Sequence, residues 1–164
     1  MGFQRLMRDL TINGVCSSAL VPRKIRWRAL RFLGLDIEGA CTVSPNCWFG
    51  GNNVAIGLNA TINYGCFFDN SARITVGRSC DVGMNVLFIT GTHEIGPRSR
   101  RAGKSVAAPI VVEDGCWIGA GAILMPGVVV GSGCVIGAGS LVTSDCRPGF
   151  LYVGSPAVAK RDLK

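Results

Sequence analysis

A single histidine, His93, is the side chain of this sequence best suited to move a proton near neutral pH. Its imidazole can act as a general base toward a hydroxyl group, which is a poor nucleophile until its proton is removed. A basic cluster follows within eleven positions and consists of Arg98, Arg100, Arg101 and Lys104. We expect Arg100 and Arg101 to bind an anionic group of an acceptor, because the guanidinium pairs well with phosphate or carboxylate. Solvent-exposed charge on a loop is one alternative for this cluster, and contact with a phosphate of the donor bound to a neighbouring subunit is another.

The composition places His93 in one globular domain made of a short repeat. The chain has 164 residues, of which 23 are glycine and only 16% are charged, and this composition excludes a disordered protein. An aliphatic residue recurs every six positions, for example at Ile118, Leu124, Val130, Ile136 and Val142. A six-residue period is typical of a parallel β-helix, in which three hexapeptides form one coil and successive coils stack ~4.8 Å apart.

We therefore expect an all-β fold, a hexapeptide-repeat β-helix of about five coils that occupies residues 40–158. The period fails between residues 91 and 109, so the segment 91–109 is expected to leave the solenoid as one protruding loop with His93 near its start. A glycine often follows the aliphatic residue of a repeat, and we expect it to relieve the backbone at the turn.

Eight cysteines are present, and their spacing predicts packing rather than chemistry. The position two residues before an inward-facing residue shares the narrow interior of the coil. It needs a small apolar side chain, and buried cysteine serves as one. A disulfide framework would need an oxidising compartment, and a zinc site would need CxxC or Cys/His spacing, which the sequence lacks. We expect inert thiols and no metal site. The seven cysteines that precede an inward-facing position by two residues are Cys41, Cys47, Cys66, Cys80, Cys116, Cys134 and Cys146.

Residues 1–39 precede the repeat and carry seven basic and three acidic side chains. Pro22 and Gly34 are typical of a helix start and a helix end, so a short basic helix is expected over residues 22–33. We expect this N-terminal segment to cap the open first coil, because an uncovered solenoid end exposes apolar surface. A helix that lies on an anionic membrane surface is the alternative. At the other end, residues 159–164 form a basic tail.

The net charge of +7 does not by itself indicate a nucleic-acid-binding protein. The body of the repeat is nearly neutral and has neither a helix-turn-helix pattern nor an aromatic stacking platform, so no nucleic acid partner is expected. No apolar run reaches the ~18 residues of a membrane span, and no signal-peptide cleavage pattern follows the N-terminal segment. We expect a cytoplasmic protein, with weak contact of residues 22–33 with the inner membrane surface as the alternative.

Several motifs occur in a fixed order along residues 40–161. They are Ile62-Asn63-Tyr64-Gly65-Cys66-Phe67-Phe68-Asp69-Asn70, Ile89-Thr90-Gly91-Thr92-His93, Trp117-Ile118-Gly119, Leu124-Met125-Pro126-Gly127-Val128 and Gly154-Ser155-Pro156-Ala157. In these motifs the chain resembles the left-handed β-helix acyltransferases of the hexapeptide-repeat superfamily, most closely the galactoside, maltose and surface-polysaccharide O-acetyltransferases. The resemblance implies a left-handed coil, acetyl-CoA as the donor, a hydroxyl of a sugar or glycoconjugate as the acceptor, and a homotrimer with active sites between subunits.

The resemblance also implies roles for individual residues. His93 matches the catalytic histidine of the family, which acts as the general base in direct transfer. Asn63 and Asp69 match residues that bind the acceptor, although Asn and Asp also shape turns. Small residues on one solenoid face would let the pantetheine arm of acetyl-CoA approach the backbone, and basic residues near the C-terminus would bind its phosphates. The expected contacts are Trp117, Gly119, Ala120, Ala138, Thr143, Lys160 and Arg161.

Other activities share this fold and stay open as alternatives. A streptogramin-type xenobiotic acetyltransferase or an amino-sugar N-acetyltransferase would also fit the repeat and the base, and a non-catalytic β-helix scaffold would fit the repeat alone. A zinc-dependent carbonic anhydrase of this architecture is excluded, because it needs three histidines and the chain has one.

Overall fold

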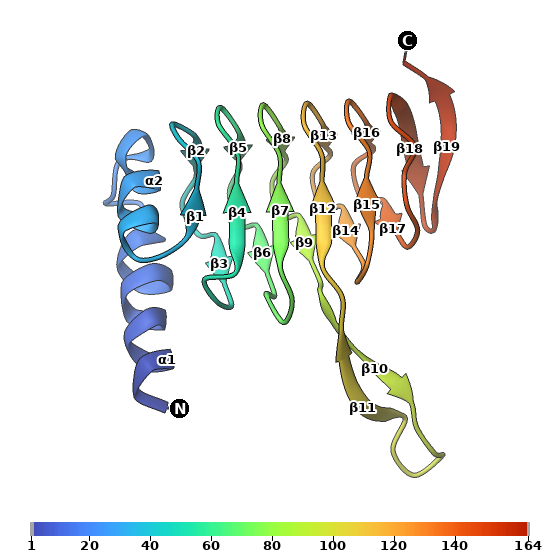
Figure 1. The fold of residues 1–164 in the computed structure, drawn as a ribbon, viewed down its shortest axis with the longest axis horizontal. Helices are drawn as coiled ribbons and strands as arrows, with labels where there is room; N and C mark the ends of the chain where they lie inside the picture. Colours follow the sequence, from blue (N-terminus) through green and yellow to red (C-terminus); the bar gives the residue numbers. More distant parts are fainter. Residues whose placement is uncertain (1, 164) are drawn as a thin grey trace.

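The computed structural model describes residues 2–163, which form a three-sided β-solenoid with helices at its N-terminal end (Figure 1). The helices are α1 (Gly2–Arg8), the π-helix η1 (Asp9–Cys16) and α2 (Arg23–Phe32). The expected basic helix is α2, whereas the sequence did not predict α1 and η1. No helix in the described range is long and apolar enough to cross a bilayer.

Three parallel sheets form the sides of the solenoid, and we call them faces A, B and C in chain order. Face A contains β1 (Asp36–Ile37), β4 (Val54–Ile56), β7 (Ile74–Val76), β12 (Ile110–Val112) and β15 (Val129–Val130). Face B contains β2 (Thr42–Val43), β5 (Thr61–Ile62), β8 (Asp81–Val82), β13 (Trp117–Ile118), β16 (Val135–Ile136) and β18 (Phe150–Gly154), with β19 (Ala157–Asp162) antiparallel at its end. Face C contains β3 (Trp48–Phe49), β6 (Phe67–Phe68), β9 (Leu87–Phe88), β14 (Ile123–Leu124) and β17 (Leu141–Val142).

The coil count agrees with the sequence on two faces and exceeds it by one on the third. Faces A and C have five strands each, and face B has six parallel strands because β18 adds a last partial coil. The solenoid therefore makes about six turns, against the expected five. The turns between faces are named the A–B, B–C and C–A corners after the strands that they join.

The interior is filled by in-register columns of small and large apolar side chains. The aliphatic positions of the repeat are fully buried, and so are all eight cysteines, which are unpaired thiols. Several thiols donate a hydrogen bond to a carbonyl of the next coil, as from Cys66 to Gly83 at 3.1 Å and from Cys116 to Gly131 at 3.2 Å. Burial raises the pKa of Cys41 to about 11, so this thiol is far from the thiolate that a nucleophile requires.

Three phenylalanines stack inside the solenoid beneath face C. The rings of Phe49 and Phe68 are 4.9 Å apart, and those of Phe68 and Phe88 are 4.7 Å apart, each pair within 7° of parallel. All three rings are almost completely buried. The stack joins three consecutive coils through β3, β6 and β9, directly below the point where the chain leaves the solenoid.

Two glycines at one corner are required for different reasons. A Cβ atom on Gly119 would lie 2.4 Å from the backbone nitrogen of Ala138 in the next coil, so close stacking of the coils excludes a side chain there. Gly121 has open space around it but a φ of +68°, a conformation that L-residues rarely adopt. The glycine after the aliphatic residue therefore allows close stacking of the coils, and the turn itself depends on the glycine two positions later.

The N-terminal helices cover the first coil. The buried side chain of Arg26 donates hydrogen bonds to the carbonyl oxygens of Cys16 at 2.6 Å and Val43 at 2.6 Å, which ties α2 to both η1 and β2. The side-chain amide of Asn13 accepts a hydrogen bond from the backbone N–H of Phe49 and donates one to its carbonyl oxygen. It thereby satisfies the two backbone groups that a strand of a preceding coil would otherwise pair with. These contacts support the expected cap, because they are directed toward the first coil.

The expected excursion is a β-hairpin that leaves the C–A corner and projects from the solenoid (Figure 1). Its strands are β10 (Gly91–Ile95) and β11 (Ala102–Ala107), which pair antiparallel and place His93 opposite Ser105. The chain then re-enters the solenoid at Ile110, which pairs with Ile74 on face A.

The phenylalanine stack generates a stability prediction. Phe68→Ala should lower the free energy of unfolding by about 3–5 kcal/mol, because it removes the middle ring of the stack and leaves a cavity. Urea unfolding followed by circular dichroism measures this change. Phe32→Ala is the control, since Phe32 is 91% exposed and its loss should have little effect. Equal midpoints for the two variants would contradict the role given to the stack.

Candidate functional site

His93 borders a cleft between the hairpin and the C–A corner. Its side chain is exposed on β10, close to the point where the hairpin leaves the solenoid. The cleft has a volume of about 560 Å³ and is mostly apolar, with a few hydroxyl and carboxylate groups. Its lining residues are Phe67, Asp69, Ser71, Ile89, Gly91, Thr92, His93, Ser105, Val106 and Ala107.

Asp69 joins the base of this hairpin to the preceding coil. Its Oδ2 atom accepts hydrogen bonds from the backbone N–H of Gly91 at 2.6 Å and from both the N–H and the hydroxyl of Thr90 at 3.0 Å. Its Oδ1 atom accepts a bond from the hydroxyl of Ser71 at 3.0 Å. These contacts fix the two residues that connect the solenoid to the strand carrying His93.

The electrostatics of Asp69 agree with this anchoring role. Partial burial raises the pKa of its carboxyl group, but the hydrogen bonds from Gly91, Ser71 and Thr90 together outweigh burial and hold the pKa below its usual value. Thr90 is fully buried, and its hydroxyl also accepts a bond from the N–H of Ala72 at 3.0 Å. Most of the acceptor capacity of Asp69 is therefore used within the chain, and only Oδ1 has capacity left for a bound ligand.

A second group of potential contacts lies on the B–C corner. No hydrogen bond among residues 2–163 uses the backbone N–H groups of Met84, Ala120 and Ala138, which occupy equivalent turn positions in three successive coils. Ala138 is exposed and Ala120 is partly exposed, and neither side chain is large enough to shield its amide. The corner therefore offers a column of open N–H donors to carbonyl or phosphate oxygens.

The equivalent donors at the A–B corner are used by carboxylates. The N–H of Leu58 bonds Glu38, that of Arg78 bonds Asp114 at 2.7 Å, and that of Ser132 bonds Glu113 at 2.8 Å. Negative side chains thus fill this corner and would repel an anionic ligand. Unlike the A–B corner, the B–C corner therefore keeps backbone N–H groups that can bind the oxygen atoms of a ligand.

The other expected donor contacts divide between two regions. Trp117 is 60% exposed on the outer side of face B, two residues before the open corner. Lys160 and Arg161 are exposed on β19, which closes the C-terminal end of the same face. Thr143 is exposed but follows β17 of face C, so it lies on the C–A corner. The structure does not bring Thr143 together with the other expected donor contacts.

Asn63 and His93 lie at opposite edges of face C within one chain. Asn63 follows β5 and belongs to the B–C corner, where its side-chain oxygen accepts a hydrogen bond from the N–H of Tyr64 at 3.0 Å. Asp69 follows β6 and belongs to the C–A corner with the His93 cleft. Six residues of extended chain separate these two corners, a span of at most about 20 Å. A ligand that contacts both Asn63 and His93 of the same chain would have to cross the whole of face C.

Arg100 and Arg101 lie at the tip of the hairpin, away from the cleft. The turn is closed by a backbone bond from Gly96 to Arg101 at 2.9 Å, and the guanidinium of Arg101 donates to the Gly96 carbonyl. Both arginines are exposed, and neither lines the His93 cleft. Their expected role in acceptor binding therefore stays a prediction, one that the arrangement of a single chain does not support.

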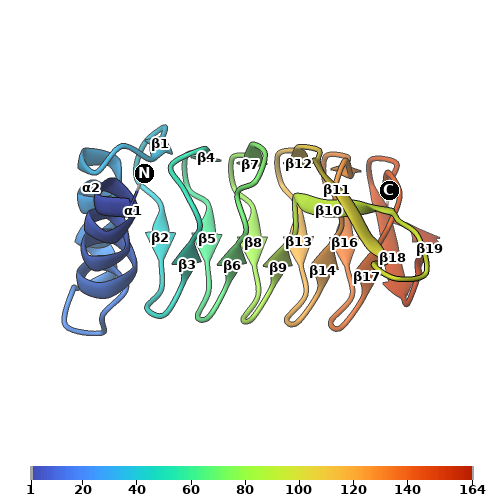
Figure 2. The same cartoon turned by 90° about the horizontal axis from the view of Figure 1, so that it is seen from below.

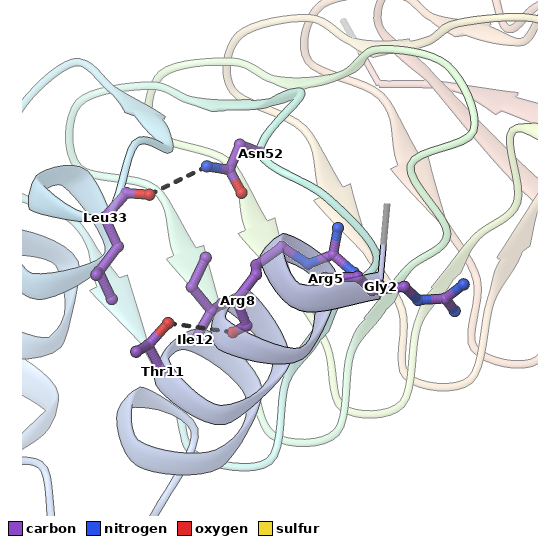
Figure 3. Close-up of a pocket in the computed structure, with 7 residues that line it drawn as sticks. All are labelled: Gly2, Arg5, Arg8, Thr11, Ile12, Leu33 and Asn52. Atoms are coloured by element: carbon purple, nitrogen blue, oxygen red, sulfur yellow. Dashed lines mark hydrogen bonds between the residues drawn. The ribbon is translucent and has the colours of Figure 1, made fainter.

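Another hollow shares no lining residue with the His93 cleft. It has a volume of about 670 Å³ and lies against α1, with Arg5, Arg8, Leu33 and Asn52 among its lining residues (Figure 3). A third hollow of about 360 Å³ is also lined by Arg5 and Arg8 and shares Phe67, Asp69 and Ser71 with the His93 cleft. The sequence did not indicate these arginines, because nothing in it places α1 beside the C–A corner.

Comparisons with known proteins agree with this geometry. Residues 109–144 match the family model described as bacterial transferase hexapeptide (six repeats). Nodulation protein L of Rhizobium meliloti is 40% identical over 144 residues, which cover 86% of this chain and 78% of that protein. A hexapeptide-repeat acetyltransferase of Vibrio cholerae, solved in complex with acetyl coenzyme A, is 30% identical with a TM-score of 0.82 and covers 100% of this chain and 92% of its own. A maltose O-acetyltransferase of Clostridium difficile is 30% identical with a TM-score of 0.83, covering 98% of this chain and 86% of its own.

The anchoring role of Asp69 can be tested without an activity assay. In Asp69→Ala the amides of Thr90 and Gly91 should exchange with deuterium at least about 10-fold faster, because each lost charge-assisted bond is worth about 1.5–3 kcal/mol. Asp69→Asn should retain most of the protection, since its side-chain oxygen can still accept these bonds. Asp81→Ala, an exposed change on face B, is the control.

The same bonds predict a pH dependence. Because the pKa of Asp69 is lower in the folded state than in the unfolded chain, its contribution is complete above pH ~4 and is lost as the pH falls through the folded value. The protection factors of Thr90 and Gly91, taken relative to intrinsic amide exchange at each pH, should therefore fall in acid more steeply in the wild-type protein than in Asp69→Asn. Identical profiles for the two proteins would contradict the anchoring role.

Proposed function

This chain belongs to the hexapeptide-repeat acetyltransferase family, and we propose that it transfers an acetyl group from acetyl-CoA to a hydroxyl of a sugar or glycoconjugate. Its solenoid is the left-handed β-helix of that family. The sugar is proposed as the acceptor because the maltose O-acetyltransferase resembles the chain over 98% of its length. The observation that carries the proposal is the position of His93. Its side chain is exposed and lines the cleft near the base of the hairpin, which the hydrogen bonds of Asp69 hold in place.

The B–C corner fits the proposed donor. Acetyl-CoA supplies a thioester carbonyl that is open to attack by a hydroxyl group. The open N–H groups of Ala120 and Ala138 can bind amide carbonyls of the pantetheine arm. Gly119 has no side chain that would hold the arm away from these N–H groups. Lys160 and Arg161, which are exposed at the end of face B, would bind the phosphates. Trp117 would flank the arm on the outer side of the face.

His93 is proposed as the general base. A ring nitrogen would take the proton of the acceptor hydroxyl as its oxygen attacks the thioester carbonyl carbon. The same imidazolium would then return the proton to the sulfur of the departing coenzyme A thiolate, so that histidine ends the cycle unchanged. The buried cysteines are unsuited to carry the acetyl group, because their thiols face the interior of the solenoid.

The separation of the two corners supports a shared site. One chain holds His93 at the C–A corner and the open amides at the B–C corner, on opposite edges of face C. The outer side of face C is entirely apolar, with Trp48, Phe67, Leu87, Ile123 and Leu141 in successive strands. Such a surface favours association between copies of the chain. A homotrimer with this contact would bring His93 of one subunit toward the donor corner of the next.

The proposed base is tested by His93→Ala. Turnover should fall by about 10²–10⁴-fold, the range typical of a lost general base, because the hydroxyl then has no group to accept its proton. Release of the coenzyme A thiol is the measurement, with glucose, maltose, galactose and lactose as trial acceptors. Lys104→Ala, an exposed change on the same hairpin, is the matched control and should retain activity. Undiminished turnover in a folded His93→Ala protein would remove His93 from the mechanism.

A further inference from the structure

The outer face of α2 is basic. On the inner face, the buried Arg26 donates to the carbonyl of Val43 in the first coil. Lys24, Arg28 and Arg31 follow one another at spacings of four and three residues, so they lie together on the opposite side of the helix, and all three are exposed. Figures 1 and 2 show the N-terminal helices lying across one end of the solenoid. The outer face of α2 is therefore part of the end surface of the molecule.

Two large apolar side chains lie beside these charges. Ile25 and Phe32 are seven residues apart, which is about two helical turns, and they are 47% and 91% exposed. At this spacing they border the basic residues along one edge of the outer face. We call the five residues Lys24, Ile25, Arg28, Arg31 and Phe32 the cap surface.

The positive charge of the cap surface has no acidic partner within residues 2–163. None of its three basic side chains forms an ion pair there, and Arg28 only lies over the ring of Trp27, 4.9 Å from its centre. The acidic residues among positions 1–39 are each paired with another arginine: Asp9 with Arg8, Asp36 with Arg73, and Glu38 with Arg78. The cap surface therefore keeps its positive charge for a partner outside the chain.

The mixture of charged and apolar side chains favours a lipid surface over a nucleic acid. Anionic headgroups attract clustered lysine and arginine, and apolar side chains beside them insert between the lipids. Single-stranded nucleic acid instead stacks its bases on several aromatic side chains along a groove. The cap surface is the convex side of a helix, and Phe32 is its only aromatic residue. A second copy of the same surface is disfavoured, because like charges would face each other.

The proposed homotrimer would leave the cap surface open. Its contact runs along face C, on the side of the solenoid, whereas α2 covers the end (Figure 1). In a cyclic trimer whose axis runs along the solenoids, the three N-terminal ends lie on the same side of the assembly. Three cap surfaces would then bind one membrane together, which raises the apparent affinity without any new contact.

We propose that the cap surface docks the protein on a bilayer with anionic headgroups. Lys24, Arg28 and Arg31 bind the headgroup phosphates, and Phe32 and Ile25 insert among the lipids. The inner face of α2 remains the cap of the first coil. The hairpin leaves the third coil and projects sideways (Figure 1), so the docked protein keeps its His93 cleft away from the lipid. The inference goes beyond the proposed function, since the chemistry of acetyl transfer does not depend on it.

Vesicle binding tests the proposal. Co-sedimentation compares vesicles of phosphatidylcholine alone with vesicles in which about one quarter of the lipid is phosphatidylglycerol. The wild-type protein should bind the anionic vesicles at least about 10-fold more tightly, and ~1 M salt should remove most of this difference because it screens the charges. Lys24→Gln/Arg28→Gln/Arg31→Gln should weaken binding to the anionic vesicles by at least about 10-fold.

A variant of the hairpin separates local charge from net charge. Arg98→Gln/Arg100→Gln/Lys104→Gln changes three exposed side chains and lowers the net charge by the same amount as the α2 variant. It is the matched control and should bind the anionic vesicles as the wild-type protein does. An equal loss of affinity in both variants would mean that the net charge binds the vesicles, and it would contradict the proposal.

A fluorescent label tests the insertion of the side chain at position 32. All eight native thiols are buried, so a cysteine added at the surface can be labelled selectively. In Phe32→Cys, a polarity-sensitive label should shift its emission to shorter wavelength on anionic vesicles. Ile95→Cys is the control, because Ile95 is 89% exposed but lies on the hairpin, and its label should show no shift.

Equal binding to the two kinds of vesicle, or binding to neither, would overturn the proposal. Tighter binding of a single-stranded oligonucleotide than of the vesicles would overturn it too, as would a lipid-free pairing of assemblies that the α2 variant abolishes. Acetyl transfer to soluble sugars should be the same in the α2 variant and in the wild-type protein. Failure of the docking proposal therefore leaves the proposed function intact.

Discussion

In-register stacking of the coils is the constraint on which the rest of the structure depends. Each strand pairs with the equivalent strand of the next coil, so every residue lies directly against its counterpart there. Inside the solenoid this produces the phenylalanine stack and the cysteine columns. At the corners it leaves no room for a Cβ at Gly119. Outside, it aligns equivalent turn amides into columns that are either filled by carboxylates or open to a ligand.

The same constraint determines where catalytic groups can be placed. A solenoid has no natural cleft, because its faces are flat and its corners are regular. The chain makes a cleft by leaving at the C–A corner after Phe88 and returning at Ile110, and it fixes the exit through the bonds of Asp69 to Thr90 and Gly91. We regard Asp69 as a positioning residue for His93, since its bonds hold the chain that carries the imidazole.

Much of this arrangement could be predicted from the sequence, because a six-residue period leaves few alternatives. The period predicted the inward residues and the buried cysteines, which are observed. It also predicted that the chain leaves the solenoid, although not that the excursion pairs as a hairpin. From the sequence, Thr143 was grouped with Ala120 and Ala138, and this grouping was wrong. Ala120 and Ala138 are eighteen residues apart, which is one full coil, so they occupy the same corner. Thr143 follows a strand of face C and lies on another corner. The place of α1 could not be predicted, because nothing local specifies how a helix docks on a solenoid. The burial of Arg26 contradicts the usual exposure of arginine.

In the proposed homotrimer, the base of one subunit acts on the donor held by another. Complementation between two inactive variants tests it: His93→Ala lacks the base, and Ala138→Glu places a carboxylate on the open amide column, as at the A–B corner. Each variant alone should transfer acetyl groups at about 1% of the wild-type rate or less. After unfolding and refolding in an equal mixture, the assemblies should recover about a quarter of wild-type activity, since random assembly forms one intact site in four between neighbours. Mixed assemblies that form but stay inactive would contradict a site shared between subunits.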